Sequence, residues 1–178
     1  MKRIRLAVPA VLVGILALVV IGGATAKKPA LSATPVFKLN LKPSQEVPPI
    51  KDLRADAVGS ITLDLERSSG GAITSGEVIF YFNYAFPGSV TINGLHIHQG
   101  AKGANGAPVI DSGINSGAGA IMDADGEGNV TKIVTVTGAS AATLQAILDN
   151  PRNYYVNLHT SVNPGGALRE QMHNPKKR

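Results

Sequence analysis

The sequence predicts an all-β protein, an antiparallel β-sandwich or barrel of about eight strands with one short helix near 141–149. Two observations carry this prediction. Short segments along the chain alternate apolar and polar residues, which is typical of strands with one buried face. Turn residues, mainly glycine, proline and asparagine, separate these segments at nearly regular spacing, as in antiparallel sandwiches and barrels.

Four strands are expected in the first half of the chain. They cover residues 36–41, 58–65, 76–84 and 91–99. The connection 42–49 cannot be a central strand, because its three prolines donate no backbone hydrogen bonds and fix φ. Turns are expected at 68–71, which reads Ser-Ser-Gly-Gly, and at Pro87-Gly88.

The second half of the chain holds the remaining strands and the helix. The expected strands cover 107–111, a short segment around 120–122, 130–137, 154–160 and 167–172. The helix 141–149 follows Ser140, a suitable N-cap. Leu144, Ile147 and Leu148 fall at helical spacing on one face. Pro151 ends the helix, because the residue before a proline avoids the helical region.

The same alternation and helical spacing predict the hydrophobic core. Its expected members are Ile61, Leu63, Leu65, Val78, Phe80, Phe82, Ile133, Leu144, Ile147, Leu148 and Val156.

The first 26 residues have the three parts of a secretory signal peptide. The basic start consists of Lys2, Arg3 and Arg5. Residues 6–21 are almost wholly apolar, and the tripeptide 24–26, Ala-Thr-Ala, fits a cleavage site. An uncleaved membrane anchor is the alternative, although about 16 apolar residues fall short of the roughly 20 that a span needs.

Cleavage after Ala26 leaves a mature chain of 152 residues (178 minus 26) that begins at Lys27. Within it we expect a linker at 27–35, one domain at 36–173 and a basic tail at 174–178. The expected protein is therefore exported, either secreted or retained in the periplasm or cell envelope, with no stable membrane span after cleavage.

Composition narrows the class of protein further. The net charge is +5, but without the three basic residues of the signal segment 14 basic residues face 12 acidic ones. No basic stripe is interleaved with aromatic residues, so no nucleic-acid partner is expected. The chain has no cysteine and cannot form a disulfide. A domain of about 150 residues buries roughly two thirds of its unfolded surface and can build a core without one.

Three of the four histidines lie in predicted strands. His96 and His98 point to the same face of the strand 91–99, because side chains alternate. His159 belongs to the strand 154–160. Imidazole suits copper and zinc, so the three histidines are a candidate metal site if one sheet brings them together. Metal affinity should then fall as the pH drops through the usual histidine range near 6.5. The alternative is surface or half-buried histidines held by hydrogen bonds, which for His96 and His98 would go to the glycine-rich segment that follows them.

Arg169 and Glu46 are two further candidate functional residues. Arg169 can bind an anion through its forked guanidinium, or it can be a packing or ion-pair arginine with Glu46 or Asp111 as partner. Glu46 can pair with Arg169 or a histidine, or be solvated. Residues 123–128 resemble part of a calcium loop, but Val134 stands where the bidentate glutamate belongs, which predicts a plain turn. No catalytic residues are assigned, because no nucleophile triad, phosphate loop or dinucleotide motif is visible.

Several motifs together resemble the CHRD domain, the module named after chordin and also found alone in exported bacterial proteins. The matching segments are 41–49, 95–100, 103–109, 155–160 and 163–171. The resemblance implies an immunoglobulin-like β-sandwich. The family pattern usually closes with Gly-Gly-Glu-Ile-Arg-Gly-Gln. Here Ala167 replaces that glutamate and Glu170 replaces the last glycine of the pattern, so any role of the missing carboxylate does not transfer.

Two functions follow as hypotheses. The first is a non-enzymatic binding or assembly module at the cell envelope, with an envelope or extracellular partner of unassigned identity. The second is a protein that binds copper or zinc through His96, His98 and His159. A special case resembles copper–zinc superoxide dismutase, which also carries a His-x-His strand, a late-strand histidine and an arginine on a β-sandwich. The chain lacks the cysteines and the histidine-rich zinc loop of that family, and only His173 remains as a fourth ligand.

Overall fold

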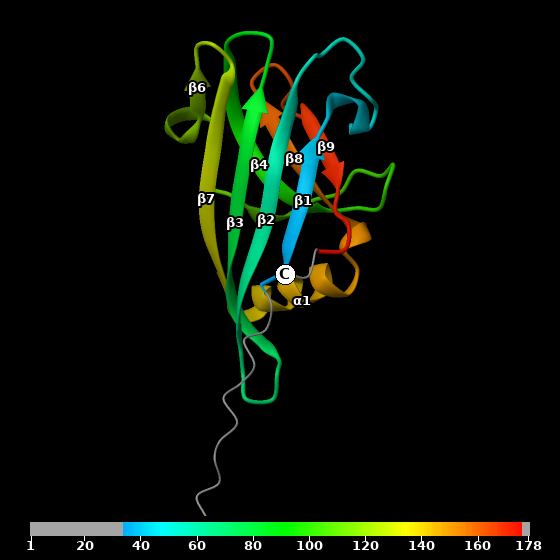
Figure 1. Cartoon of the computed structure of the whole chain (residues 1–178), viewed down its shortest axis with the longest axis vertical. Helices are drawn as coiled ribbons and strands as arrows, with labels where there is room; N and C mark the ends of the chain where they lie inside the picture. The colour runs from blue at the N-terminus through cyan, green and yellow to red at the C-terminus, as the bar shows by residue number, and fades with distance from the viewer. Residues whose placement is uncertain (1–33, 176–178) are drawn as a thin grey trace, which may run out of the picture. The chain divides into compact units, whose positions relative to one another are not determined.

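The computed structural model describes residues 34–175, which contain nine strands, one α-helix and four single-turn 3-10 helices (Figure 1). The strands are β1 (Val36–Leu41), β2 (Asp56–Arg67), β3 (Ile73–Ala85), β4 (Val90–Gln99), β5 (Pro108–Asp111), β6 (Ile121–Asp123), β7 (Glu127–Thr137), β8 (Tyr154–Thr160) and β9 (Leu168–Gln171). The 3-10 turns are η1 (Pro43–Gln45), η2 (Gly117–Gly119), η3 (Gly138–Ser140) and η4 (Pro151–Asn153). The α-helix α1 covers Ala141–Asp149.

The strands form two antiparallel sheets that pack face to face (Figure 1). Sheet A has the order β1-β2-β3-β7. Sheet B has the order β5-β4-β8-β9, and β6 also pairs with β4. The prediction of an antiparallel β-sandwich with one short helix is therefore confirmed. The strands are longer than expected in sheet A because β2 and β3 continue past the predicted ends into a long hairpin.

The core lies between the two sheets. Eight of the eleven predicted core residues are fully buried there: Ile61, Leu63, Val78, Phe80, Phe82, Leu144, Ile147 and Val156. Leu65 and Leu148 are half-buried at its edge. The prediction for Ile133 was wrong, because its side chain is 59% exposed. Strand β7 turns Val130 and Val136 inward, and a residue at odd spacing from them must face the solvent.

Helix α1 has the predicted bounds but lacks a capping hydrogen bond at its N-terminus. Leu144 and Ile147 point into the core beside β3, and the Leu144 side chain lies against Gly76. Ser140 stands at the predicted N-cap position, but it has helical backbone angles and its side chain makes no capping hydrogen bond. The reason is that the 3-10 turn η3 already occupies Gly138–Ser140 and leads directly into the helix.

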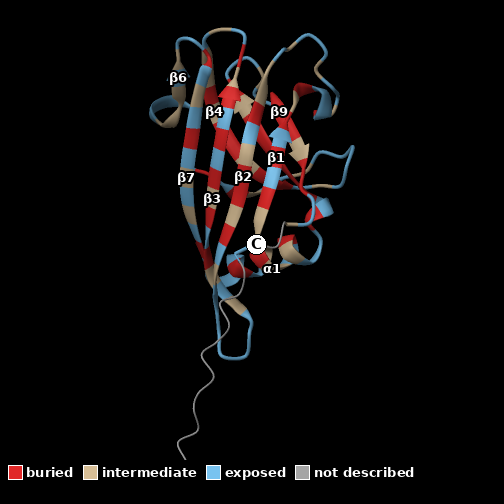
Figure 2. Ribbon diagram, viewed as in Figure 1, coloured by how far each residue is buried: buried red, intermediate tan, exposed pale blue. Residues whose placement is uncertain are grey.

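Figure 2 shows the outward face of sheet A, where exposed residues alternate with buried ones along the strands. On the outward face of sheet B, the side chains of His98, Asn157 and Arg169 are buried. Two segments lie over sheet B, which we call the proline-rich connection (residues 42–50) and the glycine-rich loop (residues 100–107). Hydrogen bonds from Arg169 to Ala104 O and from Gln171 to Gly100 O fasten the glycine-rich loop to β9. Asn105 Nδ2 donates to Val47 O and links the two segments.

The expected signal peptide, linker and basic tail belong to the two ends of the chain. The predicted signal peptide at 1–26 and most of the linker at 27–35 lie outside the described residues, as does the end of the basic tail. Among residues 34–175, no helix is long and apolar enough to cross a membrane.

Candidate metal centre

Strands β4 and β8 lie side by side and bring the three strand histidines together. In β4, Leu95 and Ile97 are buried in the core, so His96 and His98 project from the outward face of sheet B. The antiparallel register places Gly94 opposite His159. His159 therefore projects beside the pair on the same face, which is the pairing that the metal hypothesis required.

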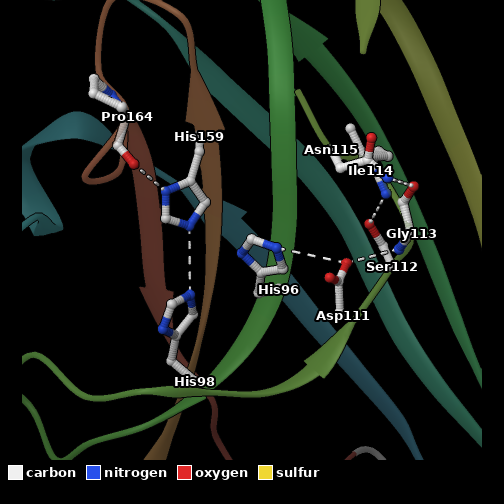
Figure 3. Close-up of polar contacts among 9 residues, drawn as sticks. All are labelled: His96, His98, Asp111, Ser112, Gly113, Ile114, Asn115, His159 and Pro164. Atoms are coloured by element: carbon white, nitrogen blue, oxygen red, sulfur yellow. Dashed lines mark hydrogen bonds and ion pairs between the residues drawn. The ribbon is translucent and has the colours of Figure 1, made fainter. Parts of the chain in front are cut away.

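The three imidazoles face one another at short range (Figure 3). The ring centroids of His96 and His159 are 4.9 Å apart. The ring centroid of His98 lies 5.5 Å from each of these two. His98 Nε2 and His159 Nε2 are 3.4 Å apart. One nitrogen of each histidine lies within 4.8 Å of the others. A single ion with bonds near 2 Å can therefore be reached by all three after a small ring movement.

The nitrogens that face away from the cluster meet oxygen atoms. His98 Nδ1 lies 2.9 Å from Gly106 O, and His159 Nδ1 lies 3.0 Å from Pro164 O. A carbonyl oxygen only accepts, so both Nδ1 atoms carry the proton and donate. His96 Nε2 faces Asp111 Oδ1 at 3.6 Å, which favours the proton on that nitrogen (Figure 3).

The inward nitrogens are consequently left as acceptors. His98 Nε2 and His159 Nε2 face each other, and His96 Nδ1 is buried with no hydrogen-bond partner among the described residues. Figure 3 shows the His96 ring with this nitrogen turned toward the other two rings. One ligand nitrogen from each ring thus lies within 4.8 Å of the other two. Metal-binding histidines have this arrangement, with the outer N–H held by a carbonyl or carboxylate.

Electrostatics keep the three rings neutral. Burial lowers the pKa of His98 to about 4, although the hydrogen bond with Gly106 O opposes the shift. Burial also lowers the pKa of His96, with repulsion by His159 adding to it, and burial lowers the pKa of His159. Neutral imidazole is the form that binds a metal ion, and the lowered pKa values favour this form.

Gly94 forms the backbone wall of the cluster. A Cβ atom at this position would lie 2.8 Å from His96 Cε1 and 3.2 Å from His159 Cδ2. The register of β4 against β8 shifts between Ile92 and Gly94, so a bulge precedes the histidines. The absence of a side chain lets both rings lie against the strand, and any larger residue would spread them apart.

Arg169 lies near the cluster, but its guanidinium is engaged elsewhere. It donates to Asn105 Oδ1 at 2.9 Å and to Ala104 O at 2.8 Å, and its Cζ lies 3.5 Å from the centre of the Tyr155 ring. Asp111, one expected partner, faces His96 instead. Burial raises the pKa of Glu46, the other expected partner, while the nearby positive charge of Arg169 opposes this shift.

Glu46 is itself buried on the proline-rich connection. Its Oε2 lies 3.5 Å from Asn157 Nδ2, and its Oε1 has no hydrogen-bond partner among the described residues. Burial raises the pKa of Glu46 to about 7, against the opposing effects of Arg169 and Asn157. The carboxyl group therefore carries a proton over much of the range below neutral pH.

Two other sequence features lie apart from the cluster. The side chain of His173 is 60% exposed and lies 3.8 Å from Glu170 Oε1, so it is not brought to the three histidines. Residues 123–128 form the predicted turn, in which Asp123 accepts a hydrogen bond from Gly126 N and another from the Tyr84 hydroxyl.

The sequence predicts contacts between the glycine-rich loop and the strand histidines, and His98 makes one, but it does not identify the individual residues that orient the three rings. Gly94, Gly106 and Pro164 act through backbone, and Asp111 was considered only as a partner for Arg169. Gly106 and Pro164 do fall inside the motifs quoted for the family resemblance. Those motifs were the one available signal that these positions matter.

Comparison with known proteins agrees with the fold. The CHRD domain family matches residues 37–172, which is most of the chain. No curated protein and no solved structure matches it.

Proposed function

We propose that this chain, which belongs to the CHRD-domain family, is an exported, non-enzymatic module that binds one copper or zinc ion. The ligands are His96 Nδ1, His98 Nε2 and His159 Nε2. The single observation that carries the proposal is the convergence of these three unprotonated nitrogens, each on a ring whose other nitrogen faces an oxygen acceptor.

The donor set favours copper and zinc over other ions. Imidazole nitrogen suits both metals, and no thiolate or carboxylate competes within the cluster. Two nitrogens bound to one tetrahedral ion lie about 3.3 Å apart, which follows from bonds of about 2.0–2.1 Å. The 3.4 Å between His98 Nε2 and His159 Nε2 is close to this value. Three protein ligands leave a fourth position for water or a partner group.

Export and a role at the cell envelope are supported by the sequence. Residues 1–26 have the pattern of a secretory signal peptide. The ion would reach the protein after export, and an envelope or extracellular partner would meet it there.

The dismutase-like alternative has less support than simple binding. The histidines do lie on two neighbouring strands of a β-sandwich. The counterpart of the arginine near the copper in superoxide dismutase is Arg169. Its guanidinium donates to the glycine-rich loop and lies over the Tyr155 ring, so it is engaged within the fold. The proposal therefore stops at metal binding.

The experiment is a metal titration of protein purified without an affinity histidine tag. Elemental analysis should find one equivalent of Cu²⁺ or Zn²⁺ after loading and desalting. Free metal at about 100 times the dissociation constant should stabilise the fold by about 2.7 kcal/mol. His96→Ala, His98→Ala and His159→Ala should each remove most of this gain, whereas the exposed His173→Ala should retain it. An unchanged melting temperature with both metals would refute the proposal.

A further inference from the structure

The Tyr155 ring lies between a proposed metal ligand and a buried arginine. Its ring and that of His98 are nearly parallel, at 12°, with centroids 4.9 Å apart. The guanidinium carbon of Arg169 lies 3.5 Å from the same ring's centre. Strand β8 runs between β4 and β9, so His98 and Arg169 approach Tyr155 from opposite sides. The three side chains form one stack on the outward face of sheet B.

Arg169 also fixes the glycine-rich loop. Its two terminal nitrogens donate to Asn105 Oδ1 and to Ala104 O, a forked pattern that a lysine cannot reproduce. The side chain is almost completely buried, and among the described residues no carboxylate forms an ion pair with it. Glu46 is the charged group that faces it from the proline-rich connection. A buried cation without a close counter-charge is costly, which points to a role beyond packing.

The loop that Arg169 holds in turn holds His98. Gly106 O accepts the proton of His98 Nδ1 at 2.9 Å. The Tyr155 hydroxyl accepts a hydrogen bond from Gly106 N at 3.1 Å and lies 3.3 Å from Gly106 O. Tyr155 therefore contacts His98 through its ring and fixes the carbonyl that His98 needs through its hydroxyl.

We infer that Arg169 is a positioning residue for the metal ligand His98. It acts on His98 by two routes, through the Tyr155 ring and through the glycine-rich loop that ends at Gly106. It does not touch the ion. This inference rests on the proposed function, because the orientation of His98 matters for affinity only if His98 is a ligand. No comparable contact joins Arg169 to His159, whose Nδ1 is fixed by Pro164 O.

The test compares Cu²⁺ and Zn²⁺ affinities in three backgrounds. In the otherwise unchanged protein, Arg169→Lys should weaken binding about tenfold, the lower end of what loss of an orienting partner costs. The same weakening should appear in the His159→Ala background. It should vanish in the His98→Ala background, because the ligand through which Arg169 acts is gone. Arg67→Lys, at an exposed arginine of sheet A, is the matched control and should leave every affinity unchanged.

A second variant covers the case in which Arg169→Lys does not fold. Asn105→Ala removes one acceptor of the guanidinium at an exposed position of the loop and should give the same pattern with a smaller fold-change. Equal weakening in all three backgrounds would overturn the inference, because Arg169 would then act on the fold as a whole.

A metal-free measurement separates this inference from the proposed function. In the protein without metal, Arg169→Lys should shift the NMR signals of the His98 ring and speed exchange of its Nδ1 proton, with little change at His159. Unchanged His98 signals would overturn the inference even if metal binds. Shifted signals in a protein that binds neither Cu²⁺ nor Zn²⁺ would refute the proposed function and keep the positioning contact.

Discussion

The outward faces of the two sheets differ in which side chains are exposed and which are buried. On sheet A, the outward side chains of Val58, Tyr81 and Ile133 are 49%, 43% and 59% exposed. On sheet B, the outward side chains of Asn157 and Arg169 are only 2% exposed although both are polar. Apolar side chains thus lie in solvent on one sheet, while polar and charged side chains are buried on the other.

The difference in burial between the two faces points to sheet B as the functional one. Single exposed apolar residues on a sheet are ordinary and need no partner. Buried polar groups cost free energy unless each one is satisfied, so a sheet face that gathers them is organised for something other than stability. The unsatisfied atoms His96 Nδ1, Glu46 Oε1 and Asn157 Oδ1 all lie on or over this face of sheet B. The comparison leads to four tests, taken from the largest expected effect to the smallest.

The largest effect should separate the inward and outward faces of sheet A. Phe80→Ala removes a fully buried ring and should cost about 3–5 kcal/mol in the free energy of unfolding. Ile133→Ala, on the outward face, should change it by less than about 0.5 kcal/mol. Denaturant unfolding of both variants measures the contrast. A cost above about 2 kcal/mol for Ile133→Ala would mean that this face is covered in solution.

The next effect should appear on the outward face of sheet B. Gln171 Nε2 donates to the carbonyl oxygens of Gly100, Arg152 and Tyr154. Gln171→Ala leaves the part-buried oxygens of Gly100 and Arg152 without this donor, whereas Tyr154 O keeps its bond from Met172 N, and it should cost about 1–3 kcal/mol. Thr131→Ala, an exposed polar position of sheet A, should cost less than about 0.5 kcal/mol. Equal costs for the two variants would remove the distinction between the faces.

A smaller effect is expected at Gly94, and it should fall on metal binding. Gly94→Ala places a methyl group against the His96 and His159 rings, which can move apart. Metal affinity should fall about tenfold, equivalent to about 1.4 kcal/mol. Gly59 of sheet A gives the contrast, because its Cβ would meet the backbone oxygen of Tyr81, which cannot move aside. Gly59→Ala should lower the melting temperature of the metal-free protein much more than Gly94→Ala does.

The smallest effect concerns pH and Glu46. Its pKa is raised to about 7 in the folded protein, so the unfolded chain releases this proton first as the pH rises. The contribution of Glu46 to stability is therefore complete below about pH 4.5 and is lost as the pH rises toward 7. The three histidines have lowered pKa values and act in the opposite sense, because their contribution is lost as the pH falls below 6.5.

The Glu46 contribution can be isolated by substitution. The difference in unfolding free energy between the unchanged protein and Glu46→Gln should decline steadily from pH 4.5 to 7. Glu77→Gln, at an exposed position of sheet A, is the matched control for the loss of one carboxyl group. A flat difference for Glu46→Gln would mean that its carboxyl group is hydrated in solution.

Much of the local structure follows from the sequence alone. The bounds of β1, β8 and α1 coincide with those expected, because alternation and helical spacing are strong in these segments. The prediction for Ile133 failed because Val130, Val134 and Val136 share one face of the strand by alternation, and Ile133 lies at odd spacing from all three. The face of β7 is decided by its long-range pairing with β3, in which Ile133 lies opposite Ile79.

The candidate site was predictable in its ligands but not in its geometry. Alternation placed His96 and His98 on one face, whereas the arrival of His159 depends on pairing between β4 and β8, which are about 60 residues apart. The acceptors that orient the rings are backbone oxygens of Gly106 and Pro164. No side-chain pattern encodes their positions. Burial also moves the expected loss of metal affinity in acid to a lower pH than 6.5, because the pKa of His98 falls to about 4.

The central claim is that three specified nitrogens bind one ion, and nitrogen-resolved NMR of the histidine rings during a Zn²⁺ titration tests it most directly. Before metal is added, the proton should reside on His96 Nε2, His98 Nδ1 and His159 Nδ1. At one equivalent of Zn²⁺, the signals of His96 Nδ1, His98 Nε2 and His159 Nε2 should shift together to metal-bound values, while His173 stays unchanged. Saturation with fewer than three of these nitrogens shifted, or binding through the opposite nitrogen of any ring, would contradict the account.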